Sequence, residues 1–172
     1  MKKFLLVLCI GFFTIQNVAA QKALKVWVVR HAEKITSNPK DKDPELSSEG
    51  SVRAEALLKL LKGEKIDSIF TTNFKRTKLT AFPLADKIGL ALKMYNSADQ
   101  KTFAKQLMAN AKGKNILIVG HSNTVLEAVE AFGGVKPMAE LKDEDYDYIF
   151  LLTIKNGKTE VKVERYGAKS GQ

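Results

Sequence analysis

The chain contains only two histidines, and each of them follows a short apolar run. His31 comes after Arg30 at the end of the run 24–29, and His121 comes one residue after the run 116–119. An arginine guanidinium presents a rigid fork of donors that suits phosphate oxygens, and a neutral imidazole can attack phosphorus. A single histidine at a strand end is more often structural, but the repeated placement favours a catalytic or anion-binding site that holds both.

Short β-branched runs of this kind are typical of strands that are buried on both faces of a parallel sheet. Because the carboxyl ends of parallel strands meet at one edge, the two imidazoles are expected there together. Arg76 follows the strand expected at 66–71, in a polar turn that opens a helix, and it is expected to join them. Ser122 and Asn123 open the helix after His121, where free backbone amides favour an anion. Arg76 can also be a solvated charge at a helix start, and Ser122 and Asn123 can as well be helix caps.

The rest of the chain alternates between strand and helix patterns, with a polar surface loop at 33–44. Strands are expected at 23–30, 66–71, 90–95 and 115–119, and helices near 46–63, 72–89, 97–113 and 123–132. Ser97 and Gln100 have the spacing of a capping box, and Pro83 suits the first turn of its helix or a bend. Asn156-Gly157 is a strong hairpin signal between strands at 148–154 and 159–165. The pattern predicts a three-layer α/β/α sandwich whose mixed, mostly parallel sheet ends in a C-terminal hairpin.

Residues 1–20 have the pattern of a cleaved secretory signal peptide, which leaves 21–172 as one domain. Two lysines precede an apolar segment, 4–13, that is too short for a stable membrane span, although an uncleaved anchor is an alternative. Cys9, the only cysteine, lies in this segment, so the remaining domain has no thiol for a disulfide, for catalysis or for metal binding. The pattern predicts a periplasmic or secreted protein.

The formal net charge is +9, and it is two lower without the two lysines of the signal segment. A positive balance of this size favours anionic partners without identifying one. Neither an alternation of aromatic and basic residues nor a Cys/His module points to nucleic acid as a partner. Two histidines cannot fill a typical zinc site, and no His-Glu-x-x-His spacing is present. The sequence therefore predicts chemistry without a metal or another cofactor.

Four short motifs occur in the order and spacing of the histidine phosphatase superfamily, also called the phosphoglycerate mutase-like family. They are Arg30-His31-Ala32-Glu33, Leu46-Ser47-Ser48-Glu49-Gly50, Arg76-Thr77-Lys78-Leu79-Thr80-Ala81 and Gly120-His121-Ser122. The resemblance runs from Lys25 to about Ile154, and the short chain is similar to the small bacterial phosphohistidine phosphatases. It implies a phosphoglycerate mutase-like fold for the whole domain.

The same resemblance implies that His31 is the nucleophile, which becomes transiently phosphorylated. Arg30, Arg76 and His121 would form the phosphate pocket and stabilise the transferring group. This agrees with the chemistry of phosphoryl transfer, which depends mostly on positioning and charge neutralisation. Two nearby guanidinium groups should also lower the pKa of His31 and keep its attacking nitrogen unprotonated near neutral pH.

The chain departs from the family pattern in three places. Ala32 stands where a glycine is common, and Ser122 stands where the acid phosphatase and phytase branch has an aspartate, which disfavours that branch. The glutamate donor of the mutase branch follows the third strand, where this chain offers only Asp99, explained equally well as an acid in the first turn of a helix. Glu33 and the acidic run 143–145 are other candidates, so the proton donor stays unassigned.

The sequence thus predicts a secreted or periplasmic, metal-independent phosphatase that hydrolyses phosphate monoesters, or a related phosphorylated substrate, through a phosphohistidine on His31. The expected partner is a small phosphorylated substrate or a phosphopeptide. One alternative is a phosphate-binding or sensing protein of the same fold with little or no turnover, because an obvious acid is missing. A phosphomutase is less favoured because the chain has little room for the usual capping insertions.

Overall fold

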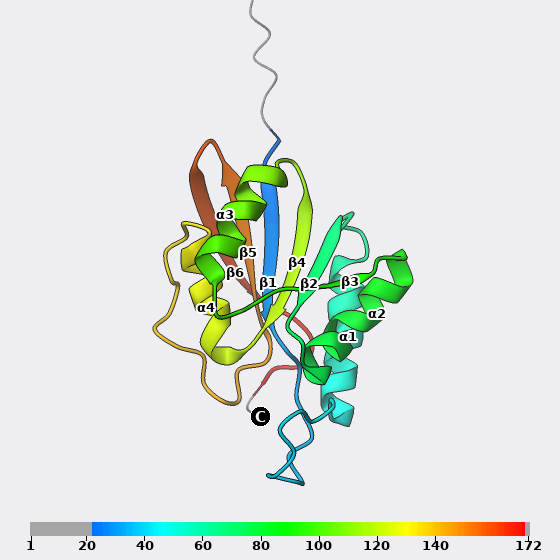
Figure 1. Ribbon diagram of the computed structural model, residues 1–172. Coiled ribbons are helices and arrows are strands. Elements are labelled where there is room, and N and C mark those ends of the chain that lie inside the picture. The colour runs from blue at the N-terminus through cyan, green and yellow to red at the C-terminus, as the bar shows by residue number, and fades with distance from the viewer. Residues whose placement is uncertain (1–21, 171–172) are drawn as a thin grey trace, which may run out of the picture.

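A six-stranded sheet runs through the centre of the molecule and is covered by helices on both faces (Figure 1). The computed structural model describes residues 22–170, so the predicted signal peptide, 1–20, lies outside the described residues. The elements are β1 (Leu24–Arg30), α1 (Ser48–Leu61), β2 (Ser68–Thr71), α2 (Lys75–Ile88), β3 (Leu92–Met94), α3 (Gln100–Asn110), β4 (Asn115–Gly120), α4 (Ser122–Ala131), β5 (Tyr148–Lys155) and β6 (Lys158–Arg165). Within the described part of the chain, no helix has the length and apolar character needed to cross a membrane.

The strands lie in the order β3-β2-β4-β1-β5-β6. The first four in the chain are parallel to one another, whereas β5 is antiparallel to its neighbours β1 and β6. Asn156 and Gly157 join β5 to β6 with φ angles of 52° and 73°, the left-handed pair that a tight two-residue hairpin turn requires. The predicted mixed, mostly parallel sheet with a C-terminal hairpin is therefore confirmed.

The apolar character of β1 is continuous because the strand is buried on both faces. Val26 and Val28 pack with apolar residues of α3 and α4, whereas Trp27 and Val29 pack with those of α1 and α2. Figure 1 shows these two pairs of helices on opposite sides of the sheet. The predicted three-layer arrangement is confirmed as well.

Both faces are covered because the chain reverses its direction across the sheet. From β1 it passes to β2 and then to the edge strand β3, and it returns to β4, which lies between β2 and β1. Right-handed connections then place α1 and α2 on one face and α3 on the other. The neighbouring strands β1 and β4 mark the point of reversal, and the carboxyl ends of strands at such a point are where open α/β sheets bind ligands.

Pro83 lies well inside α2, so its expected place in the first turn is wrong, whereas the alternative of a bend in the helix stays a prediction. The helix begins at Lys75, directly after the turn, where the hydroxyl of Thr77 donates to the carbonyl of Phe74 at 2.9 Å. One side of the helix is buried, and its buried residues are Thr77, Thr80, Ala81, Leu84 and Ala85. This packing outweighs the hydrogen bond that a proline removes from the helix interior.

The capping box predicted at Ser97 and Gln100 is also wrong. The residue that caps α3 is Asp99, whose carboxylate accepts a hydrogen bond from the N–H of Thr102 at 3.2 Å. Aspartate is as good a cap as serine, and its charge is favourable at the positive end of a helix dipole. The helix therefore starts one residue after Asp99 rather than after Ser97.

Replacing Gly50 with alanine is expected to lower the free energy of unfolding by about 1–3 kcal/mol, because the new methyl group would overpack the start of α1. A Cβ added at Gly50 would lie 2.0 Å from the backbone oxygen of Glu33, so the helix or the loop after β1 must move. Gly63 is the matched control, since a Cβ there meets nothing within 4 Å. Urea unfolding of Gly50→Ala and Gly63→Ala measures the difference, and equal stabilities would contradict the close contact.

Candidate active site

Both histidines lie at the carboxyl ends of the two central strands. Arg30 ends β1 beside Gly120, which ends β4, and the N–H of His31 extends this pairing by donating to the Gly120 carbonyl at 2.9 Å. His121 follows immediately, and its ring centroid lies 5.4 Å from that of His31 in an edge-to-face arrangement. The parallel register of β1 and β4 is therefore what brings the two imidazoles together.

The ring of His31 is held with one nitrogen engaged and the other free. Its Nδ1 lies 2.8 Å from the carbonyl oxygen of Ala32, which can only accept a hydrogen bond, so Nδ1 carries the proton of the neutral ring. The Ala32 N–H is itself fixed, because it donates to the hydroxyl of Thr80 in α2 at 2.9 Å. In this tautomer the lone pair is on Nε2, where an imidazole can act as a nucleophile.

The surroundings of His31 keep it neutral. Burial is the main cause and, with the charges of Arg30 and Arg76 and the nearby His121, it lowers the pKa of His31 to about 3, although the hydrogen bond to Ala32 acts in the opposite direction. Burial also lowers the pKa of His121 to about 4, helped by the charges of Arg76, Arg30 and a nearby lysine. Both imidazoles are therefore unprotonated at neutral pH.

The titration of the two histidines gives a direct prediction. Their imidazole NMR resonances are expected to stay unchanged from about pH 8 to about pH 5, where an ordinary histidine titrates. Because both pKa values are lower in the folded than in the unfolded chain, the unfolded state binds more protons in acid. The free energy of unfolding should therefore be constant above about pH 6.5 and fall as the pH decreases toward about 4. His31→Ala should reduce the pH dependence of the free energy of unfolding. A histidine resonance that titrates near pH 6.5 would contradict the burial of that imidazole ring.

Arg30 is almost fully buried, with 5 % of its surface exposed. Its Nη1 donates to the carbonyl oxygens of Lys142 and Asp143 at 2.9 Å and of Asp145 at 3.3 Å, all in the loop before β5. Its guanidinium also stacks on the ring of Tyr146 at 4.0 Å. These contacts fix the group in place but leave its Nε buried without a hydrogen-bond partner.

Arg76 lies in the first turn of α2 and is arranged in a similar way. Its guanidinium stacks on Phe74 at 4.3 Å, and its Nη1 lies 3.7 Å from a carboxylate oxygen of Asp43. Its Nε is also buried and has no partner. Two guanidinium groups with unpaired buried N–H donors near two neutral imidazoles form a site that an anion would complete, because each unpaired donor costs about 1–3 kcal/mol.

His121 is the N-cap of α4, and Ser122 and Asn123 are the first two residues of that helix. The backbone N–H of His121 donates to the hydroxyl of Thr124 at 3.0 Å, which anchors the helix start. The capping alternative for Ser122 and Asn123 is therefore wrong, since the cap is the histidine itself. Backbone N–H groups at these first positions have no partner inside the helix and are suited to an anion.

Glu33, one of the proton-donor candidates, is engaged in a partly buried ion pair with Arg53. Its carboxylate receives two hydrogen bonds from Nε of Arg53, at 2.9 and 3.0 Å, and a third from Nη2 at 2.6 Å. Arg53 also donates to the carbonyls of Tyr166 and Ala168 near the C-terminus. Glu33 thus ties the loop after β1 to the C-terminal residues, and the structure gives it a structural role.

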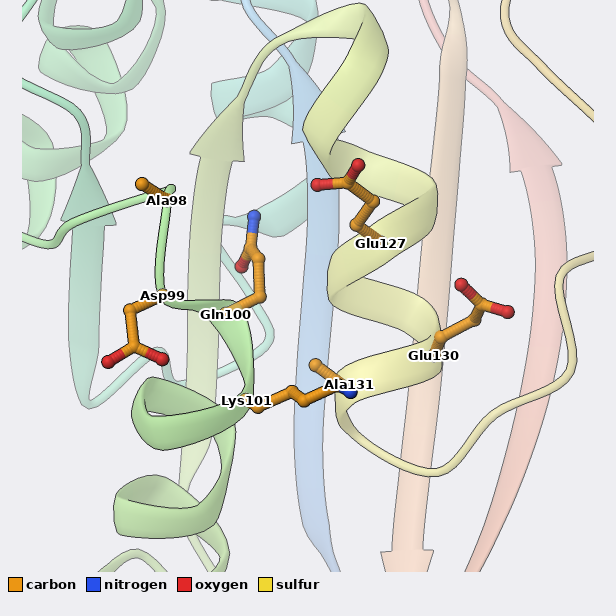
Figure 2. A pocket seen from close by; sticks show the side chains of 7 residues that line it. All are labelled: Ala98, Asp99, Gln100, Lys101, Glu127, Glu130 and Ala131. Atoms are coloured by element: carbon orange, nitrogen blue, oxygen red, sulfur yellow. The ribbon is translucent and has the colours of Figure 1, made fainter.

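Asp99, the second candidate, is engaged in capping α3 through Thr102. It lines a hollow of about 620 Å³ between α3 and α4, together with Glu127 and Glu130 (Figure 2). Figure 2 shows the Asp99 carboxylate pointing away from these two glutamates. The acidic run 143–145 contacts Arg30 through its backbone, because the carbonyl oxygens of Asp143 and Asp145 accept hydrogen bonds from the guanidinium group.

Several residues of the site were not found from the sequence. Tyr146 and Phe74 support the two guanidinium groups, and Thr72 accepts or donates a hydrogen bond with Nε2 of His121 at 2.9 Å. The sequence gives a weak indication that Phe74 and Thr72 belong to the site, because they lie in the turn before Arg76. It gives no such indication for Tyr146. Among residues 22–170, no group of three His, Cys, Asp or Glu side chains is placed to hold a metal ion.

Comparisons with known proteins agree with this geometry. The family model "Histidine phosphatase superfamily (branch 1)" matches residues 26–99. No curated protein matches the chain significantly in sequence.

Solved structures of similar fold cover nearly the whole chain. The protein histidine phosphatase SixA complexed with tungstate is 17% identical, with a TM-score of 0.65 over 82% of this chain and 96% of that one. The protein assigned as phosphohistidine phosphatase SixA in Agrobacterium tumefaciens is 16% identical, with a TM-score of 0.62 over 84% and 98% of the two chains. A mycobacterial glucosyl-3-phosphoglycerate phosphatase is 12% identical, with a TM-score of 0.66 over 86% and 100%. These likenesses confirm the predicted phosphoglycerate mutase-like fold.

Proposed function

We propose that this chain, which belongs to the histidine phosphatase superfamily, is a metal-independent phosphatase that works through a phosphohistidine on His31. The observation that carries the proposal is the free Nε2 of a buried, neutral His31 beside Arg30 and Arg76, each with an unpaired buried Nε–H. A phosphate group would supply the missing acceptors and place its phosphorus before the nucleophile. The predicted signal peptide, 1–20, supports a periplasmic or secreted location.

In the first step, the lone pair on Nε2 of His31 attacks phosphorus. An N–P bond forms while the bond from phosphorus to the leaving group breaks, and the leaving group departs with the bonding electrons and then takes a proton from water. Arg30 and Arg76 neutralise the charge that spreads over the phosphoryl oxygens, where fixed donors contribute most to the rate. The hydrogen bond from Nδ1 to Ala32 holds the ring in place and stabilises the positive charge that it gains.

In the second step, water attacks phosphorus and the N–P bond breaks, which returns the lone pair to His31 and releases inorganic phosphate. Neither Glu33 nor Asp99 offers a free carboxyl group, because one pairs with Arg53 and the other caps α3. Substrates whose leaving groups need little protonation should therefore react fastest. Phosphate monoesters with acidic leaving groups and peptides phosphorylated on histidine meet this condition, and one structural neighbour is a protein histidine phosphatase.

Hydrolysis of p-nitrophenyl phosphate in the presence of a chelator tests the proposal. The expected result is steady release of nitrophenol that the chelator does not reduce and that tungstate inhibits. Activity that disappears with the chelator would contradict metal independence. Tungstate binding without any hydrolysis would instead favour a phosphate-binding protein, the alternative that the engaged carboxylates support.

A further inference from the structure

A chain of hydrogen bonds links His121 to the backbone of the turn after β2. Nε2 of His121 lies 2.9 Å from the hydroxyl of Thr72, which lies 3.0 Å from the hydroxyl of Thr77. The Thr77 hydroxyl lies 3.0 Å from the carbonyl oxygen of Thr72 and 2.9 Å from that of Phe74. Both threonines are buried, so these groups have no water to replace a missing partner. We call Thr72 and Thr77 the threonine pair.

The direction of each hydrogen bond follows from the number of protons available. A hydroxyl has one proton, and Thr77 must give it to the two carbonyl oxygens beside it, since these can only accept. Thr77 therefore accepts from Thr72, which uses the single proton of the Thr72 hydroxyl. What remains on Thr72 is a lone pair facing Nε2 of His121. A hydrogen bond at 2.9 Å then requires that the proton lies on Nε2.

We propose that Thr72 is a positioning residue that, with Thr77, fixes the proton of neutral His121 on Nε2 and leaves the lone pair on Nδ1. In this tautomer the ring of His121 is held in one orientation beside His31. The role in turnover rests on the proposed function, whereas the position of the proton does not.

The charges around His121 keep its ring neutral. The groups that face it are Arg76, Arg30, Lys34 and the neutral His31, and none of them carries a negative charge. These cations oppose a second proton on the ring, so the neutral tautomer is the form that Thr72 holds.

The ¹⁵N chemical shifts of His121 test the position of the proton without any turnover. In the wild-type protein at neutral pH, Nε2 should show the shift of a protonated ring nitrogen and Nδ1 that of an unprotonated one. Thr72→Val should give a mixture of tautomers, and Thr72→Ser should restore the wild-type pattern. A wild-type spectrum with the proton on Nδ1 would overturn the proposal.

Turnover provides the second measurement. Thr72→Val should lower kcat/KM about 10- to 100-fold, mainly through KM, and Thr72→Ser should recover most of it. Thr71→Val is the matched control, because Thr71 is also buried and its hydroxyl donates to the sulfur of Met94 at 3.7 Å. Equal activity of the Thr71 and Thr72 variants would overturn the positioning role. If the wild-type protein hydrolyses nothing, the proposed function fails, and the chemical shifts still decide the proposal about Thr72.

Discussion

Replacing His31 with alanine is expected to lower kcat for p-nitrophenyl phosphate by about 10⁴-fold or more, the scale of the loss when a nucleophile is removed. The substitution deletes Nε2, the free nitrogen, and Nδ1, which donates to Ala32. Arg30 and Arg76 are held by residues other than His31, so the anion site should persist. Initial rates, corrected for traces of wild-type protein, measure the effect.

Tungstate binding is the control for this variant. His31→Ala should bind tungstate with an affinity within about tenfold of the wild-type value, because both guanidinium groups remain. That result would separate loss of the nucleophile from loss of the site. A variant that keeps more than a tenth of the wild-type kcat would show that another group attacks phosphorus.

Replacing Arg76 with alanine is expected to lower kcat/KM about 10²- to 10³-fold, the usual cost of one donor to a transferring group. Arg76 is a cleaner target than Arg30, whose Nη1 also holds the loop before β5 through three carbonyls. The single ion pair of Arg76, to Asp43 at 3.7 Å, is long and half-exposed, so the Tm should change little. Arg76→Lys should recover only part of the activity, because a lysine cannot offer the planar fork of donors.

Lys75→Ala is the matched control for Arg76→Ala. The neighbouring side chain is exposed and pairs with Glu45 at 3.4 Å, so its removal takes the same charge from the same helix end. Its kcat/KM should stay near the wild-type value. Similar losses in the two variants would mean that Arg76 acts through general attraction of anions and not through contact with the phosphoryl group.

The arrangement of the strands was predictable because its signals are local. The apolar runs that end at Arg30 and at Gly120 are buried on both faces, as continuous runs in parallel strands are, and Asn156-Gly157 marks its own turn. The meeting of His31 and His121 follows from the pairing of β1 with β4. This meeting was predictable because both residues directly follow their strands.

The supports of the site were not predictable, since they join segments that are far apart in the sequence. Arg30 bonds to carbonyls more than 110 residues away, and a carbonyl carries no sequence signal. Arg53 likewise joins Glu33 to the C-terminal residues, which removes the glutamate from the set of free acids. In both cases the partner is decided by tertiary packing and not by residue type.

The reassignment of Asp99 has a similar origin. Its place after the third strand made it a candidate donor, while its place at the start of α3 made it a cap, and a local hydrogen bond to Thr102 decides for the cap. Thr72 is the reverse case, since an ordinary polar residue in a turn gains its role only because β2 and β4 are neighbours. The contacts of His121 with His31 and with Thr72 both depend on the pairing of strands that are far apart in the sequence.

The most direct test of the whole account is to identify the phosphorylated residue during turnover. The protein is mixed with excess substrate, quenched within milliseconds in alkali, which preserves phosphohistidine, and its peptides are examined by mass spectrometry. We expect one phosphoryl group on His31, absent from His31→Ala and lost when the sample is acidified. A phosphoryl group on His121, or hydrolysis with no phosphorylated protein at any quench time, would contradict it.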